Sequence, residues 1–140
     1  MTRLFTLVLF VAAQLPIHAV AATCAGADPA ITSVKVQNVS TSGSINQYHI
    51  LGTVTNLGSM KQPGNVLQSV DIFRDGQHMD TRGIPPLAPG QTYSFTYIWT
   101  RASDAGQGST KMLFKMRFTQ PSPPGNEDCN ANNDSFTLTF

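Results

Sequence analysis

Apolar and polar residues alternate along most of the chain after residue 30, and this period of two constrains the fold more than any other feature. The alternation is clearest over 92–100, where Tyr93, Phe95, Tyr97 and Trp99 are separated by single, mostly small polar residues. No comparable stretch has the period and length of an amphipathic helix. We therefore expect strands, each with one face in a core and the other in water.

Seven segments carry this pattern, and turn-forming residues separate them. They are 31–39, 47–56, 67–74, 77–84, 92–100, 111–119 and 135–140. Asp75-Gly76 has the composition of a two-residue hairpin turn, and a proline pair followed by Pro89-Gly90 interrupts the chain before residue 92. The pattern predicts an all-β fold, a seven-stranded Greek-key β-sandwich of immunoglobulin or fibronectin type III kind.

The same alternation predicts which side chains form the core of the sandwich. Val34 and Val36 should share one face of the first strand. The centre of the core is expected to contain Phe95, Trp99, Phe114 and Phe118. The aromatic stripe that begins at Tyr93 could instead be a ligand platform, but core packing is the favoured interpretation.

The first 22 residues have the three parts of a secretory signal peptide. Arg3 supplies the positive start, an apolar run follows over 4–13, and Ala19-Val20-Ala21 places small residues where signal peptidase cuts. The apolar run is about ten residues long, too short for a helix to cross a bilayer core of roughly 30 Å. We expect export to the periplasm or the medium, a single domain over 23–140, and no transmembrane segment in it.

Two cysteines, Cys24 and Cys129, remain in the predicted mature chain. In an oxidising compartment this even count indicates a disulfide. A redox-active pair or a metal site is the alternative, although the CxxC spacing is absent and distant histidines make a poor zinc site. Lipidation at Cys24 is disfavoured because Thr23 precedes it.

Charge limits the partners that the chain can bind. Nine Lys and Arg residues face eight Asp and Glu, and removal of Arg3 with the signal peptide leaves eight of each sign. Neutralising nucleic-acid phosphates requires a basic excess, so nucleic acid is not an expected partner. The sequence contains no motif that calls for a cofactor.

Five segments resemble, in order, the motifs of the CARDB domain, the cell-adhesion-related domain found in bacteria. They are 56–58, 70–76, 84–91, 95–99 and 127–133. In the last segment Glu127, Asn132 and Asn133 match the family pattern, whereas Cys129 and Asn130 replace its middle residues. The resemblance covers roughly 30–140 and implies an immunoglobulin-like module of secreted bacterial proteins.

The densest polar run follows the sixth predicted strand. Its alternate residues resemble the opening of a calcium loop and make weak calcium candidates of Asp128, Asn130, Asn132 and Asp134. The positions that should hold glycine and a bidentate glutamate carry Asn133 and Thr139 instead. Amides that hydrogen-bond the backbone of a tight turn are the favoured alternative, so no metal is predicted.

A basic stripe on the sixth predicted strand is the other candidate. Lys111, Lys115 and Arg117 should share its outward face. Such a stripe could contact an acidic polysaccharide or a lipid headgroup. The favoured alternative is a solvated sheet face that discourages edge pairing.

No arrangement of residues indicates catalysis. His49 and His78 are the only histidines after the signal peptide, and no nucleophile motif accompanies either. We expect a non-catalytic binding or adhesion module for a protein or glycan of the cell envelope. The alternative is a structural or accessory subunit of a bacterial surface assembly, joined by β-strand addition.

Overall fold

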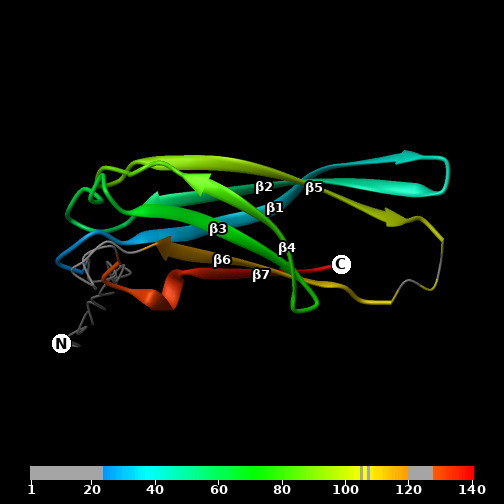
Figure 1. The fold of residues 1–140 in the computed structure, drawn as a ribbon. Coiled ribbons are helices and arrows are strands. Elements are labelled where there is room, and N and C mark those ends of the chain that lie inside the picture. The colour runs from blue at the N-terminus through cyan, green and yellow to red at the C-terminus, as the bar shows by residue number, and fades with distance from the viewer. Residues whose placement is uncertain (1–23, 105, 107, 120–127) are drawn as a thin grey trace, which may run out of the picture.

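A computed structural model describes residues 24–104, 106, 108–119 and 128–140, and these residues form seven strands in two antiparallel sheets (Figure 1). The three-stranded sheet has the order β1 (Pro29–Ser42), β2 (Ile45–Asn56), β5 (Thr92–Ala102). The four-stranded sheet has the order β4 (Gln77–Ile84), β3 (Leu67–Arg74), β6 (Lys111–Thr119), β7 (Ser135–Thr139). A 3-10 turn, η1 (Ala131–Asn133), precedes β7. The predicted all-β sandwich is confirmed.

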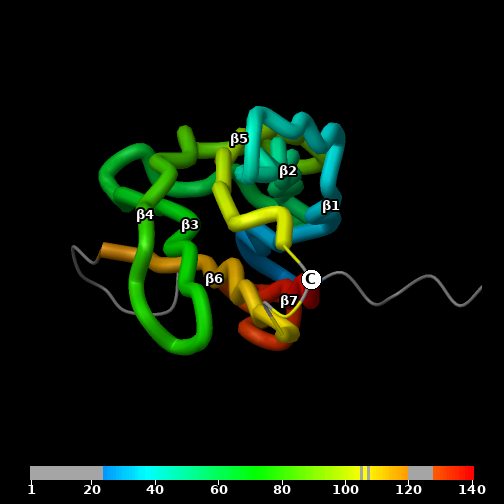
Figure 2. The backbone as a smooth tube through the Cα atoms, turned by 90° about the vertical axis from the view of Figure 1, so that its right-hand side faces the viewer, coloured from blue at the N-terminus to red at the C-terminus, as the bar shows by residue number. Residues whose placement is uncertain are grey.

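The order of the strands makes the topology that of a Greek key. Hairpins join β1 to β2 and β3 to β4, whereas the connections from β2 to β3, β4 to β5 and β5 to β6 cross between the sheets. Because β4 pairs with β3 and not with β5, the arrangement is that of fibronectin type III domains. Figure 2 shows the two sheets as separate layers.

The predicted signal peptide and Glu127 lie outside the described residues. Among the residues that the structure does describe, no helix is long and apolar enough to cross a membrane.

The three-stranded sheet is longer than predicted. Its pairing continues to Ser42↔Ile45 and Ile45↔Ala102, so β1, β2 and β5 form an arm that extends beyond the end of β7 (Figure 1). Val34 is buried as predicted. Val36 lies on the same side of the sheet, opposite the buried Ile50, but is 37% exposed because β1 is the edge strand of its sheet.

The core lies between the sheets at the positions that the alternation predicts. Phe95, Trp99 and Phe114 are buried, and Phe118 packs against their cluster from its edge. The stripe on β5 is therefore core packing, with only Tyr93 substantially exposed at its beginning.

A network around Asn56 closes one end of the sandwich. The Asn56 side chain is fully buried, and its Oδ1 accepts hydrogen bonds from the backbone N–H groups of Asp28 and Gly58, each at 3.0 Å. Its Nδ2 donates to the carbonyl oxygens of Met60 at 2.8 Å and Leu87 at 2.9 Å. One amide thus joins the N-terminal segment, the β2–β3 connection and the β4–β5 connection, so the asparagine of the CARDB-like motif is a structural residue.

A second pair of buried amides supports the same end. Gln62 and Gln68 donate to each other's side-chain oxygens, and Gln68 Nε2 also donates to the carbonyl oxygen of Pro85 at 2.6 Å. The backbone N–H of Leu87 donates to Gln62 Oε1 at 3.0 Å. These bonds hold the long β2–β3 connection, which has no regular structure of its own.

A disulfide joins Cys24 to Cys129 beside this network. The backbone N–H of Cys129 also donates to the carbonyl oxygen of Ala27 at 2.9 Å. The bond ties the N-terminal segment to the residues that precede β7. We call the end that holds the disulfide, Asn56 and the Gln62–Gln68 pair the clamped end, and the opposite end, with the arm and the Asp75-Gly76 turn, the open end.

Candidate binding site

The outer face of the four-stranded sheet carries the basic stripe predicted from the sequence. Lys111, Lys115 and Arg117 are all exposed there. The strand register places Asp71 of β3 opposite Lys115 and Phe73 opposite Leu113. The stripe therefore lies beside both apolar and acidic side chains that the linear sequence keeps apart.

A groove of about 520 Å³ crosses this face near the open end. Phe73 and Leu113 supply its apolar surface, Lys111 and Lys115 lie along it, and the Asp75-Gly76 turn closes it. Both turn residues have positive φ, 47° and 84°, which is the geometry predicted for a two-residue hairpin. The turn is anchored because Asp75 Oδ1 accepts the backbone N–H of Lys111 at 2.9 Å.

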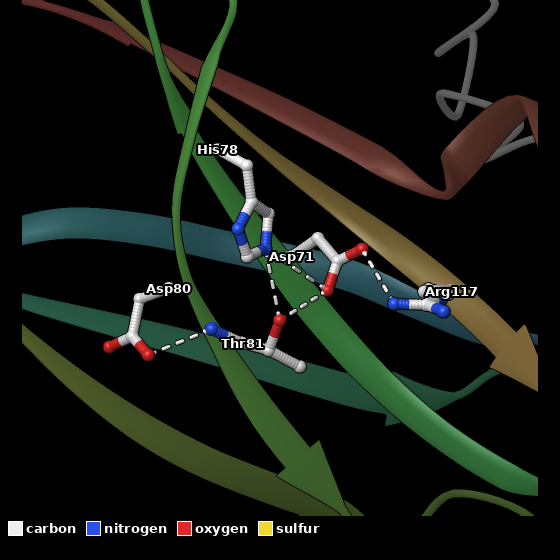
Figure 3. Close-up of polar contacts among 5 residues, drawn as sticks. All are labelled: Asp71, His78, Asp80, Thr81 and Arg117. Carbon is white, nitrogen blue, oxygen red and sulfur yellow. Dashed lines mark hydrogen bonds and ion pairs between the residues drawn. The ribbon is translucent and has the colours of Figure 1, made fainter.

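Arg117 differs from the two lysines because Asp71 pairs with it. Asp71 is 8% exposed, and its Oδ2 lies 3.7 Å from Arg117 Nη1 (Figure 3). The Thr81 hydroxyl donates to Asp71 Oδ1 at 2.7 Å, and His78 Nε2 lies 3.8 Å from the same oxygen. The stripe thus divides into two lysines at the groove and one arginine held by a carboxylate that our sequence analysis did not single out. The only feature of the sequence that could have indicated Asp71 as a partner of the stripe was its outward position in the alternation of that strand.

His78, Thr81 and Asp71 do not have the geometry of a catalytic triad. The single proton of the Thr81 hydroxyl goes to Asp71, so His78 Nε2, 3.0 Å from that hydroxyl, must be the donor to it. A triad requires the reverse, with the imidazole accepting the proton of the nucleophile. His49 lies on the opposite sheet, in β2, and takes no part in this network.

The calcium candidates lie at the clamped end, around the η1 turn. Asn130 and Asn132 flank and form η1, and the backbone N–H of Asn130 donates to Asp128 Oδ1 at 3.0 Å, as expected for a polar turn. Within the described part of the chain, no group of three or more His, Cys, Asp or Glu side chains is placed to hold a metal ion.

Asp134 has an unusual environment in the same region. Burial raises the pKa of its carboxyl group to about 7, and the negative charges of Asp128 and Asp28 and a hydrogen bond with Asp128 act in the same direction, against Lys115. Asn133 Nδ2 donates to Asp28 Oδ1 at 2.9 Å, so Asp28, itself buried, is held close by. The cluster is thus one in which Asp134 retains its proton at mildly acidic pH.

Comparison with known proteins finds similarity at the level of structure. No protein-family model matches the chain, and no curated protein does. The CARDB domain of the PF1109 protein from Pyrococcus furiosus, in a crystal structure in complex with di-metal ions, has a TM-score of 0.56 and 18% identity, and the match covers 84% of this chain and 94% of that domain. A solution NMR structure of the same domain matches with a TM-score of 0.56 and 17% identity over 83% of this chain and 94% of that one. The chain therefore has the β-sandwich fold of CARDB domain structures, as the resemblance of its motifs predicted.

Proposed function

We propose that this chain is a non-catalytic, adhesion-related binding module, exported by its signal peptide, that binds a protein or glycan of the cell envelope in the groove beside Phe73 and Leu113. Its fold, shared with CARDB domain structures, supports the adhesion-related role. The predicted signal peptide and the disulfide support export.

The single observation that carries the proposal is the composition of the groove. Apolar side chains of Phe73 and Leu113 lie next to two exposed lysines, and none of the ion pairs found among the described residues involves Lys111 or Lys115. Cations that form no direct ion pair, beside apolar surface, complement a partner that carries both acidic and apolar groups. We therefore expect the partner to be anionic where it meets Lys111 and Lys115.

A retention experiment tests the proposal. The mature chain is incubated with isolated bacterial envelopes, and the fraction that remains bound is measured against salt concentration. The double variant Lys111→Gln/Lys115→Gln should lose most of the retention. The matched control Lys35→Gln/Lys61→Gln removes two exposed lysines away from the groove and should retain it. Equal loss in both double variants would show that charge alone, and not the groove, governs binding.

The di-metal ions of the Pyrococcus furiosus domain are not part of this proposal. The carboxyl groups that lie closest together here, around Asp134, do not make a set of three ligands among the described residues. Binding at the groove, as proposed, requires no metal ion.

The β5 edge favours a second function, that of a subunit joined by strand addition. β5 pairs with β2 over 11 residues without a register shift, whereas the β1 edge has two irregularities, at Ile31/Ser33 and Val36/Asn38. Continuous edges accept added strands and bulged edges resist them. Ile98 on β5 is 49% exposed and could pack against an added strand.

Sedimentation at increasing concentration tests this second function. Self-assembly through β5 should give dimers or longer species that Ile98→Lys abolishes. Val39→Lys places the same charge on β1 at a residue of similar exposure and should leave assembly intact. A chain that is monomeric at every concentration contradicts self-assembly.

A further inference from the structure

A second hollow at the open end lies between the two sheets and not on the face that carries the groove. It measures about 400 Å³ and is lined by the ends of β3 and β5, which belong to different sheets, and by Thr110. Arg74 comes from β3 and Arg101 from β5, so folding brings two arginines to the lining of one cleft. We call it the arginine cleft.

The charges in the arginine cleft are not balanced. Among the ion pairs of the described residues, none includes Arg74 or Arg101. Asp75 is the only carboxylate in the lining, and it already accepts the backbone N–H of Lys111. The cleft thus has two cations and one acid that is already engaged.

Arg101 is held in a defined position. Its guanidinium carbon lies 5.8 Å from the centre of the Trp99 ring, and its Nη2 donates to the carbonyl oxygen of Gly108. A guanidinium has five N–H donors, so most of them remain after this single bond. An arginine fixed by stacking loses little conformational entropy when it binds an anion.

One further polar group, on a residue that lines the arginine cleft, is buried with no partner among the described residues. The indole Nε1 of Trp99 is buried without an acceptor, and Trp99 as a whole is 5% exposed. Thr110 is 8% exposed, and its backbone N–H and carbonyl oxygen are hydrogen-bonded to Phe140. A buried donor without an acceptor costs about 1–3 kcal/mol, a cost that natural proteins tolerate chiefly where the group has a role.

We propose that the arginine cleft binds the carboxylate of an acidic sugar, of the uronate class. Guanidinium groups bind carboxylates through paired, charge-assisted hydrogen bonds. Thr100 and Thr110 are also among the lining residues, and such hydroxyl-bearing side chains suit the hydroxyls that a uronate carries beside its carboxylate. An acidic peptide side chain has only methylene groups there, so the polar lining favours the sugar.

This inference is independent of the proposed groove. The two hollows share only Asp75, which separates them, and the cations of each are different residues. A single acidic polysaccharide could occupy both, but binding at the arginine cleft does not require Lys111 or Lys115.

Tryptophan fluorescence tests the inference at the site itself, because Trp99 is the only tryptophan of the chain. The mature protein is titrated with a galacturonate oligomer, and a saturable change in emission is expected. Arg74→Gln should weaken binding about tenfold or more, the usual effect of losing a hydrogen bond to a charged group. The control variant Lys35→Gln removes one positive charge from β1, outside the lining of the cleft, and should bind as the native chain does.

Three results would overturn the inference: no saturable change with the galacturonate oligomer, equal weakening by Lys35→Gln, or tighter binding of hexaglutamate, which would identify an acidic peptide as the ligand.

Because Arg101→Gln could disturb packing around Trp99, Arg74→Lys is the second variant. Its partial binding is expected since the charge remains while the planar fork is lost. The Lys111→Gln/Lys115→Gln variant should keep the fluorescence response, which separates a failure of the groove from a failure of the cleft.

Discussion

The two ends of the sandwich differ in what their polar groups contact. At the clamped end, every polar atom of the Asn56 side chain is hydrogen-bonded, two glutamines pair with each other, and a disulfide joins two distant segments. At the open end, arginines and lysines without ion pairs line two hollows, and Trp99 Nε1 lacks an acceptor. The hydrogen-bond network and the disulfide stabilise the clamped end, although Asn133 Oδ1 and Asp134 Oδ1 are buried there without a partner among the residues that the structure describes. We infer that the clamped end supplies stability and that the cations lining the two hollows of the open end supply binding.

Removing the disulfide should have the largest effect on stability. The bond closes a loop with a sequence separation of 105, and the chain-entropy model gives such a bond about 4 to 5 kcal/mol of stabilisation. Cys24→Ser/Cys129→Ser should therefore lower the free energy of unfolding, measured in urea, by that order. Under conditions where the variant remains folded, its fluorescence response to the galacturonate oligomer should persist. Loss of the response in a folded variant would contradict the division between the two ends.

Removing the Asn56 amide should have the next largest effect. Asn56→Ala leaves two buried N–H donors and two carbonyl oxygens without their partner, and should cost about 3 kcal/mol or more. Asn46 at the open end provides the matched control, since its side chain accepts one exposed hydrogen bond from Thr41. Asn46→Ala should cost about 0.5 kcal/mol, in the range of surface substitutions. Similar unfolding energies for the two variants would contradict the comparison.

The pH dependence of stability should show a smaller effect. The pKa of Asp134 is raised from 3.8 to about 7 in the folded chain, so the folded state binds a proton that the unfolded state releases. This contribution to stability is fully present below about pH 4 and is lost as the pH rises through 7. Asp134→Asn should flatten this part of the profile, measured as melting temperature between pH 4 and 8. Asp128→Asn, which removes a carboxylate that raises this pKa, should move the change to lower pH; an unchanged profile in both variants would contradict the assignment.

Local periodicity predicted much of the fold. The seven strands, the Asp75-Gly76 turn and the burial of Phe95 and Trp99 follow from a period of two that neighbouring residues define. The extra length of β1 and β2 did not follow, because the exposed residues of the arm have weak alternation, and pairing between strands extends them. The cysteine count indicated the disulfide without any geometry.

The sequence by itself determined the strands, their inward faces and the cysteine pair, since each depends on residue type and on spacing along the chain. Only the tertiary structure decided that Asp71 pairs with Arg117, that Asp28 approaches Asp134, and that Arg74 and Arg101 line one cleft. These residues come from different strands, from opposite sheets or, for Asp28 and Asp134, from the positions immediately before β1 and β7. Their contacts depend on strand register and on how the two sheets pack, and hydrophobic periodicity within a single strand contains neither.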